Sequence, residues 1–356
     1  MEEIKKIDAE QSKCKNCGGD LCFSPKEQNL KCENCGSVFE IEHSTDIQKH
    51  SLGEKRNEQE YQKFISTNNL FKCPNCGSNV LLNKFEIAKK CPYCGTSLVL
   101  QNGSDAGLKP DGVIPFGFDE EEASSRFAYQ IRKKFFAPSK LKKKIPASDI
   151  WGIYIPSFGF NVETVNRYNG SLYTTSTSTV NGKTVTTKHD FNISGTKAKN
   201  FGNVLVESSS KLTQKELNGI LPFNYSKQQT YEDGFIRGYS VEQYDTTVEG
   251  CKTTYRSIVD SLIRKEILKG YSYSGVNYLN IKTEYNNETY SYFLVPIYKF
   301  SYKFKDKQYT TFMNGQTGRV GDDFPKSKLK IALVTILALL VVAIPIIIGI
   351  ISSLAE

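Results

Sequence analysis

The sequence contains little histidine and almost no tryptophan, and several nucleotide and hydrolase motifs are missing. Of 356 residues, three are His and one is Trp. Histidine is the usual general base in enzymes, and this chain offers only three candidates for that role: His43, His50 and His189. The single Gly-Lys-Thr, at Gly182, lacks the first glycine of a phosphate-binding loop, and no dinucleotide fingerprint or nucleophile elbow is present. We therefore expect no enzyme, although catalysis by carboxylates alone needs no such motif and stays an alternative.

The N-terminus lacks an apolar stretch, whereas the C-terminus has a long one. Residues 1–13 are charged, so the sequence predicts no signal peptide. Residues 331–351 read IALVTILALLVVAIPIIIGII without a charge. At about 1.5 Å per residue, such a helix crosses a bilayer core of about 30 Å. The alternative, a core helix of a soluble protein, is less favoured because Thr335 is the one polar side chain in the run.

The residues beside this run indicate its orientation. Lys326, Lys328 and Lys330 precede it, and only SSLAE follows. Basic residues stay on the cytoplasmic side of a membrane. We expect a single-pass, tail-anchored protein of the cell membrane with its N-terminal bulk in the cytoplasm.

The cysteines form a repeated pattern. Two Cys-x-x-Cys pairs are separated by 14 residues, the arrangement recurs 59 positions later, and Gly follows every pair. Glycine allows the positive φ that reverses the chain there. Four thiolates brought together by two such turns form the closed tetrahedral shell of structural Zn²⁺ sites. The predicted ligands of two structural zinc ions are Cys14, Cys17, Cys32 and Cys35 in the first ribbon and Cys73, Cys76, Cys91 and Cys94 in the second.

Other roles for these cysteines fit the sequence less well. Disulfides are disfavoured in a chain without a predicted signal peptide. A redox Cys-x-x-Cys is expected beside a βαβ pattern, whereas this chain has four evenly placed copies. Iron–sulfur ligation stays an alternative. Cys22 and Cys251 lie outside both sets and are expected to be small buried side chains.

The chain divides into five predicted segments. Residues 12–42 and 71–101 are the zinc ribbons, and the polar linker 43–70 between them is expected to be exposed. Residues 113–322 form an aromatic-rich domain, and residues 331–351 form the transmembrane helix. Frequent Tyr, Phe, Thr and Val favour strands in the domain. The expected fold class is α+β, with two small four-cysteine zinc ribbons, an antiparallel β-rich domain carrying a few helices, and one C-terminal transmembrane helix.

Local signals predict the elements of the domain. Two helices are expected at 120–135 and 247–268, capped by Asp119 and Thr246. Asn181-Gly182 is a two-residue hairpin signal. The expected strands are 151–160, 171–180, 183–193, 276–285, 290–304 and 308–313, with a turn at Asn286-Asn287. Residues 155–160 and 295–300 resemble each other, which suggests two related β-rich halves.

The charge distribution bears on possible partners. The formal charge of +8 falls to +4 with eight thiolates and two zinc ions, so the chain is only mildly basic. A basic run follows the first predicted helix. Its candidate contacts with anionic lipid or nucleic acid are Arg132, Lys133, Lys134, Lys140, Lys142, Lys143 and Lys144. A solvated helix end and loop is the alternative interpretation.

Several short motifs resemble a known family. They are the cysteines at 73–94, Ile114-Pro115-Phe116, Phe135-Phe136-Ala137-Pro138-Ser139, Gly152-Ile153-Tyr154-Ile155-Pro156, Leu294-Val295-Pro296 and Asn314-Gly315-Gln316-Thr317-Gly318. Together they resemble the bacterial TFIIB-type zinc ribbon-containing proteins, often labelled as relatives of a primosomal helicase, over most of residues 71–322. The resemblance implies no established activity. The family's Trp-x-Phe-Asp is replaced here by Phe158-Gly159-Phe160-Asn161, and the first ribbon and the anchor are not general to the family.

These features predict a protein-binding adaptor or scaffold held at a membrane, with no small-molecule substrate. The alternative is a membrane-tethered nucleic-acid-binding protein that uses the second ribbon and residues 132–144. A third possibility is a sensor of lipid or envelope stress. The modest net charge favours the first of these.

Overall fold

The computed structural model describes most of the chain. The described residues are 5–6, 13–54, 56, 64, 68–83, 90–100, 107–138, 149–180, 182–209, 211–304, 307–322 and 324–354. Their strands form a four-stranded sheet in the order β1-β4-β3-β2 and a second sheet of eleven strands. With a few helices packed on the larger sheet, the fold is mixed α+β, as the sequence predicts.

The strands of the N-terminal third are short. They are β1 (Lys5–Lys6), β2 (Leu21–Ser24), β3 (Asn29–Cys32), β4 (Val38–Glu40), β5 (His50–Ser51), β6 (Asn68–Lys72), β7 (Asn79–Asn83), β8 (Val99–Leu100) and β9 (Gly112–Val113). β2 and β3 form the hairpin expected between the first two cysteine pairs. β7 pairs with β13 (Ser240–Glu242), and β13 pairs with β10. The second ribbon therefore belongs to the sheet of the body.

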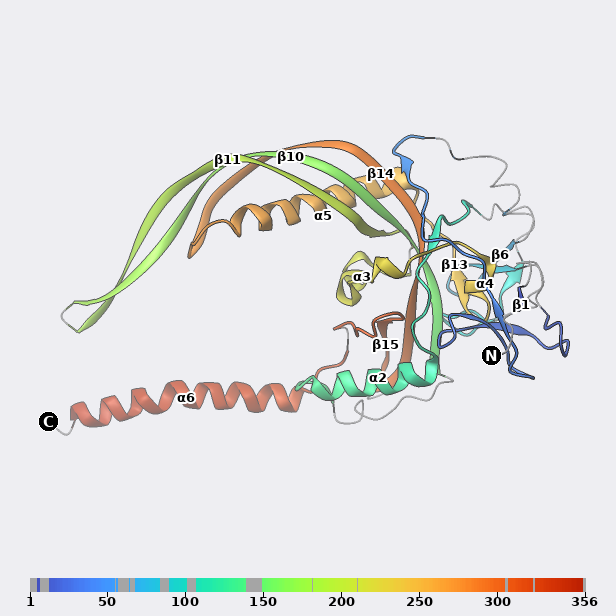
Figure 1. Cartoon of the computed structure of the whole chain (residues 1–356). Coiled ribbons are helices and arrows are strands. Elements are labelled where there is room, and N and C mark those ends of the chain that lie inside the picture. The colour runs from blue at the N-terminus through green and yellow to red at the C-terminus, as the bar shows by residue number, and fades with distance from the viewer. Residues whose placement is uncertain are drawn as a thin grey trace.

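Three long strands build a curved arch (Figure 1). β10 (Ile150–Val180) pairs along its length with β11 (Lys183–Glu207) on one side and with β14 (Gly275–Phe304) on the other. β15 (Lys307–Asn314) continues from β14 as an antiparallel hairpin. The sequence predicted this arch as shorter, separate strands. The segments predicted as separate strands join into continuous ones, because each long strand has a hydrogen-bonded neighbour over nearly its whole length.

Two turn predictions have opposite outcomes. The hairpin at 181–182 is confirmed, because Val180 pairs with Lys183 and Gly182 has a φ of 72°. The turn predicted at Asn286-Asn287 is wrong, because β14 continues through both residues. A register shift opposite 161–163 and a φ of 51° at Asn287 show a β-bulge there. Asparagine tolerates positive φ, so a bulge and a turn give the same local signal.

Helix α5 (Val248–Leu268) lies under the concave side of the arch (Figure 1). Thr247, and not the predicted Thr246, caps it by accepting a hydrogen bond from the amide of Gly250. Cys251 is buried as expected, and Tyr255 and Val259 continue the buried face of the helix. The Tyr255 ring stacks on Phe160 of β10, with ring centroids 4.3 Å apart.

Helix α2 (Glu120–Lys133) packs at the lower end of the arch. The predicted cap is confirmed, because the Asp119 side chain accepts a hydrogen bond from the amide of Glu122. Phe127 is buried and stacks on Phe300 of β14 at 4.2 Å. The predicted helix 120–135 is two residues too long, and Phe135 does not share this buried face. The helix ends at Lys133, the chain becomes extended at Lys134, and the Phe135 side chain is 59% exposed.

The remaining short elements connect the sheet to its surroundings. They are α3 (Gln214–Ile220), the 3₁₀ helix η3 (Tyr225–Lys227), β12 (Gln229–Thr230) and α4 (Asp233–Ile236). Within the predicted linker, the stretch 43–54 contacts this body through a few residues. Its β5 pairs with β14, and Ile47 and His50 are buried, whereas most other residues of the stretch are exposed. The expectation of an exposed spacer is therefore wrong only where the stretch contacts the sheet.

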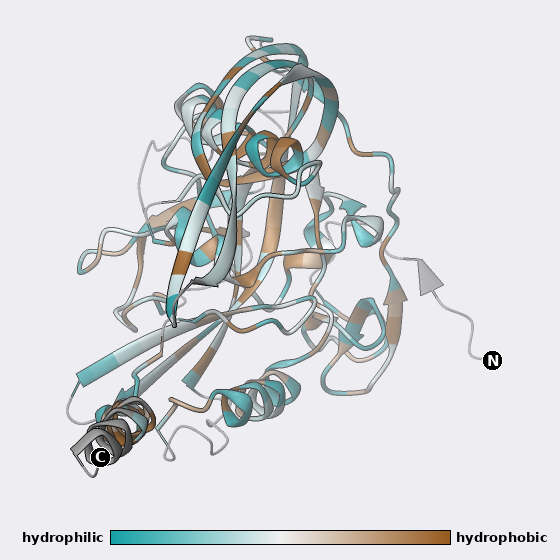
Figure 2. Cartoon of the chain, turned by 90° about the vertical axis from the view of Figure 1, so that its left-hand side faces the viewer, coloured by the Kyte–Doolittle hydropathy of each residue, from teal (hydrophilic) through white to brown (hydrophobic). Residues whose placement is uncertain are grey.

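Helix α6 (Lys328–Leu354) extends away from the body (Figure 1). It is long and apolar enough to cross a membrane, and none of its most apolar stretch, residues 328–345, is buried. Leu339 and Val341 are 64% and 66% exposed. Figure 2 shows the opposite pattern in the body, where hydrophobic segments gather in the central strands and the outer curve of the arch is mostly hydrophilic.

Candidate metal centres

The first cysteine tetrad is assembled by two turns on neighbouring strands. The Cys14 sulfur lies 3.6 Å from that of Cys35, and the Cys17 sulfur lies 3.5 Å from that of Cys32. The turns before Gly18 and Gly36 have the predicted shape, because both glycines have φ near 75° and donate backbone hydrogen bonds to Cys14 and Cys32. Cys14 and Cys32 are buried, whereas Cys17 and Cys35 face outward.

The second tetrad repeats this arrangement. The Cys73 and Cys94 sulfurs are 3.4 Å apart, and the Cys76 and Cys91 sulfurs are 3.6 Å apart. In each tetrad the four sulfurs lie within 4.8 Å of one another. All eight predicted ligands are thus brought together in the two predicted groups of four.

The donor sets fit a tetrahedral metal ion. Four sulfurs at about 2.3 Å from a central zinc lie about 3.8 Å from one another, close to the distances in both tetrads. A metal ion binds the thiolate form of cysteine, and four sulfurs at these distances can share one ion. Each tetrad can therefore hold one metal ion with every coordination position filled by sulfur.

Buried polar side chains from the body hold the second tetrad in place. Lys299 of β14 is 4% exposed, and its ammonium group donates hydrogen bonds to the carbonyls of Pro92 and Tyr93 at 2.9 and 2.6 Å. Lys211 donates to the carbonyl of Cys76 at 2.6 Å, and the Tyr93 hydroxyl donates to Glu242. A Zn²⁺ ion bound by four thiolates has a net charge of −2. The positive charges of Lys299 and Lys211 would therefore attract the filled site.

Sequence reasoning missed Lys299. It lies in an aromatic strand segment, where the alternation of side chains between the two faces of the sheet predicts only packing. The strand pattern does not reveal which cysteine turn will contact this lysine. The equivalent contacts of the first ribbon are mainly apolar and backbone. Phe23 packs on Phe235 at 5.6 Å, and Gln28 donates to the carbonyl of Phe116. An ion pair between Lys26 and Asp119, at 3.0 Å, ties the ribbon to the start of α2.

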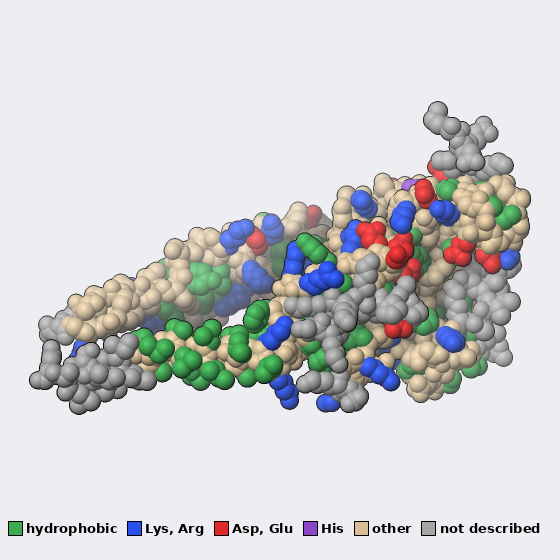
Figure 3. All heavy atoms as spheres, turned by 90° about the horizontal axis from the view of Figure 1, so that it is seen from below, with side chains coloured by type: hydrophobic (Ala, Val, Ile, Leu, Met, Phe, Trp, Pro, Cys, Tyr) green, Lys and Arg blue, Asp and Glu red, His purple; other side chains and the backbone are tan. Residues whose placement is uncertain are grey.

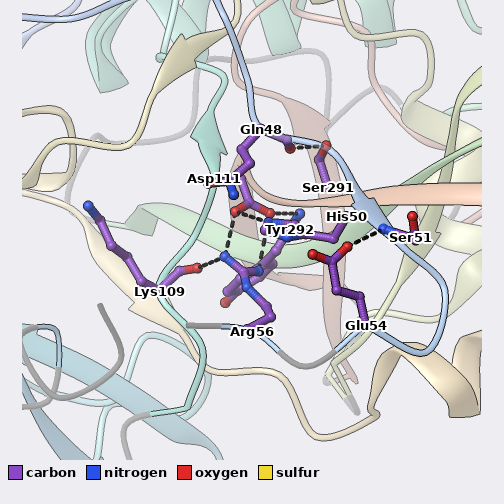
Figure 4. A network of polar contacts seen from close by, with 9 residues as sticks. All are labelled: Gln48, His50, Ser51, Glu54, Arg56, Lys109, Asp111, Ser291 and Tyr292. Carbon is purple, nitrogen blue, oxygen red and sulfur yellow. Dashed lines mark hydrogen bonds and ion pairs between the residues drawn. The ribbon is translucent and has the colours of Figure 1, made fainter. Parts of the chain in front are cut away.

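A second group of buried polar side chains includes His50 of β5 and none of the eight cysteines of the tetrads (Figure 4). The Asp111 carboxylate, with 2% of its side chain exposed, accepts hydrogen bonds from His50 at 2.9 Å and from Arg56 at 2.5 and 3.2 Å. It also accepts from the backbone amide of Tyr292 at 2.7 Å. His43 contacts the carbonyl of Ile41. Within the described part of the chain, neither histidine joins a metal-binding group.

The predicted basic residues divide into two groups. Lys140, Lys142, Lys143 and Lys144 lie outside the described residues. Arg132, Lys133 and Lys134 stand at the C-terminal end of α2. Lys134 forms an ion pair with Asp322 at 2.7 Å, and Lys133 lies over the ring of Tyr129 at 4.3 Å.

Comparison with known proteins gives one similar chain and no function. The chain is 24% identical over 336 residues to "Uncharacterized protein YdjG" of Bacillus subtilis (strain 168), an alignment that covers 90% of this chain and 91% of that protein. No family model matches the sequence. No solved structure matches it either.

Proposed function

We propose that this protein is a membrane-anchored, non-enzymatic adaptor whose two four-cysteine ribbons each hold a structural Zn²⁺ and whose body presents a surface to a protein partner. The exposed apolar surface of α6 is the observation that carries the anchor. Leu333, Leu337 and Leu339 are each about three-fifths exposed, and a continuous apolar surface of this length is covered in a soluble protein. Lys326, Lys328 and Lys330 support a cytoplasmic position of the body, because basic residues beside a membrane span stay on that side.

Three features support an adaptor over an enzyme. Both tetrads offer only sulfur and are closed, so a zinc ion in either would have a structural role. Lys299 and Lys211 bind the second tetrad to the body through hydrogen bonds. This arrangement suits a tetrad that stabilises the sheet. The outer part of the β10–β11 hairpin, residues 174–180 and 182–191, which we call the arm, is mostly exposed and projects from the body (Figure 1).

The arm offers a protein partner an open strand edge. Among the described strands, β11 pairs only with β10, so its other edge is available for hydrogen bonds. An extended segment of another protein can add to such an edge, with small polar side chains such as Thr184, Thr186 and Thr187 allowing close approach. The nucleic-acid alternative is less supported, because the chain is only mildly basic once eight thiolates bind two zinc ions.

The position of the arm constrains how the protein sits on a membrane. In Figure 1 the arm and α6 extend from the body in the same direction. A bilayer crossed by α6 in this pose would also contain the arm, whose exposed Thr, Ser and Lys side chains hydrocarbon does not solvate. The membrane-bound protein therefore requires the arm and α6 to point in different directions.

The anchor is tested by alkaline carbonate extraction of membranes that contain the full chain. We expect the wild type to stay in the membrane pellet. A variant with Leu333→Arg, Leu337→Arg and Val341→Arg should become extractable, because each Arg at the centre of a membrane helix costs about 2.5–3.5 kcal/mol. Val185→Arg on the arm is the matched control and should behave as the wild type. Extraction of the wild type would refute the anchor.

The adaptor role is tested by a photo-cross-linking amino acid at Thr186 on the arm, with Lys31 of the first ribbon as the control position. We expect a protein adduct of defined mass at Thr186 and none at Lys31. Absence of the adduct from correctly inserted protein would refute the arm as the partner surface. Salt-sensitive binding of the metal-loaded full chain to DNA or RNA would favour the nucleic-acid alternative.

A further inference from the structure

The end of α2 exposes an aromatic pair. Phe135 and Phe136 are 59% and 37% exposed, and their rings meet edge to face with centroids 5.3 Å apart. Tyr129, one and a half turns earlier on α2, is also 59% exposed. Large aromatic side chains that are not covered by the protein are typical of the headgroup layer of a membrane, where an aromatic ring is well solvated.

Hydrogen bonds join this pair to the first turn of α6. The backbone amide of Ser327 donates to the carbonyl of Phe136 at 2.8 Å. The Lys330 ammonium group donates to the carbonyls of Phe135 and Ala137, both at 2.9 Å. Phe135 and Phe136 therefore stand at the base of the helix that we propose crosses the bilayer. Figure 3 shows Lys and Arg side chains around the place where the apolar α6 leaves the body.

A basic cavity lies on the same half of α2. It has a volume of about 390 Å³ and is lined by Arg126, Tyr129, Gln130, Lys133, Lys134, Thr317 and Gly318. Three of these seven residues are cationic and none is acidic. The last two belong to the turn Asn314–Gly318, which the proposed adaptor role does not use.

Two nearby carboxylates only partly offset the charge of the cavity. Arg126 pairs with Glu122 at 2.7 Å, and Lys134 pairs with the 80%-exposed Asp322. Among the described residues, no carboxylate lies within ion-pair distance of Lys133, whose ammonium group lies over the Tyr129 ring. An anionic oxygen in the cavity would therefore meet one cation, Lys133, that no described carboxylate neutralises, beside the ion-paired Arg126 and Lys134.

From these contacts we propose that the cavity on α2 binds the phosphate headgroup of an anionic phospholipid, with Phe135 and Phe136 inserted among the lipids beside it. The proposal rests on the proposed membrane anchor and deepens it, because it assigns the face of the body that lies on the bilayer. Basic side chains supply the attraction to the phosphate, and the aromatic pair fixes the depth.

The experiment uses the full-length protein in liposomes and a single tryptophan as a depth probe. Trp151→Phe removes the only native Trp. Phe135→Trp, Leu339→Trp and Val99→Trp then place the probe at the aromatic pair, in α6 and on the second ribbon. Lipids brominated near the headgroup or deep in the acyl chain quench Trp at the corresponding depth. We expect shallow quenching at Phe135→Trp, deep quenching at Leu339→Trp and none at Val99→Trp.

Lipid selectivity is measured with the Phe135→Trp probe. Brominated phosphatidylglycerol, present as a minority lipid in phosphatidylcholine, should quench more strongly than brominated phosphatidylcholine at the same mole fraction. Lys133→Gln should reduce this preference by about five-fold, since a basic side chain near an anionic surface contributes about 1 kcal/mol. Lys31→Gln, an exposed lysine of the first ribbon, is the matched control and should leave the preference unchanged.

The remaining outcomes would overturn the headgroup site, the anchor or both. Deep quenching at Leu339→Trp without quenching at Phe135→Trp would overturn the headgroup site and keep the anchor. No quenching at either position would remove both. Quenching at Phe135→Trp that is equal for the two lipids, or unchanged in Lys133→Gln, would overturn the headgroup site. Loss of the preference on adding millimolar inorganic phosphate would show a site for free phosphate and overturn the lipid assignment.

Discussion

The buried carboxylate of Asp111 fastens the segment between the two ribbons to the body, and Asp111→Asn tests that role. The side chain accepts hydrogen bonds from His50, from both terminal nitrogens of Arg56 and from the Tyr292 amide. Asparagine has nearly the same shape and can keep one acceptor, so the substitution removes mainly the negative charge. The Arg56 side chain, 10% exposed, would then have a buried charge without its partner.

The expected loss of unfolding free energy follows from these contacts. Breaking a buried ion pair on one side costs about 3–5 kcal/mol. Arg56 keeps its hydrogen bond to the carbonyl of Lys109, at 3.0 Å, so we expect a loss near the lower end, about 3 kcal/mol. For a domain of 150–250 residues this corresponds to a melting temperature lower by about 6–12 °C.

The assay combines thermal melting with hydrogen exchange of the full chain in detergent. Amides of residues 43–54 should exchange faster in Asp111→Asn, whereas those of α5 should change less. Adding Arg56→Met removes the unpaired charge and should restore about 2 kcal/mol, a coupling measurable in a double-mutant cycle. Asp46→Asn, at an exposed position of the same segment, is the control. Asp111→Asn within 0.5 kcal/mol of the wild type, with unchanged exchange, would refute the reasoning.

Three further predictions concern the metal centres and their surroundings. Cys17→Ser and Cys76→Ser should each lower bound zinc from two ions to one, but only Cys76→Ser should lower the melting temperature of the body, because β7 is part of its sheet. Elemental analysis and calorimetry check this, and an equal effect of both would contradict it. Lys299→Met leaves the carbonyls of Pro92 and Tyr93 without their donor, which costs about 1–3 kcal/mol of stability for each. Chelators should therefore remove zinc faster from this variant than from Lys303→Met, a control at an exposed position of the same strand. Burial raises the pKa of Glu242 to about 7 from 4.5. The stability that its protonated form contributes is therefore present below pH 4.5 and is lost as the pH rises through 7. The shift corresponds to about 3 kcal/mol, so Glu242→Gln should gain up to that amount relative to wild type between pH 5 and pH 8, whereas Glu27→Gln, on an exposed turn, should gain nothing.

The features that the sequence predicted well are those decided by short-range chemistry. The cysteine spacing is sufficient to identify both tetrads, because two turns and a hairpin bring the sulfurs together locally. The Asp119 cap and the hairpin at 181–182 are similar cases. Contacts between distant segments could not be predicted. Nothing near Asp111 in the sequence indicates that His50 and Arg56 will contact it. The exposure of Phe135 arises because α2 ends at Lys133, more than one turn before Pro138.

The likeness between residues 155–160 and 295–300 has a structural counterpart at the centre of the sheet. Ile155 pairs directly with Val295, so the register is the one that a twofold axis between these residues would require. Each helix stacks on the strand that follows the other helix. Phe127 of α2 lies on Phe300, and Tyr255 of α5 lies on Phe160, with similar centroid distances.

Phe160 and Phe300 are also equivalent under the shift that carries Ile155 to Val295. Two related helix-and-hairpin halves that exchange their helices account for all of these contacts. The features that break the symmetry then stand out: the arm extends the first half alone, the second tetrad binds at Lys299 of the second half, and α6 leaves beside α2. These asymmetric features carry the proposed partner edge, the metal support and the membrane contact, whereas the symmetric centre supplies the rigid frame that holds them apart.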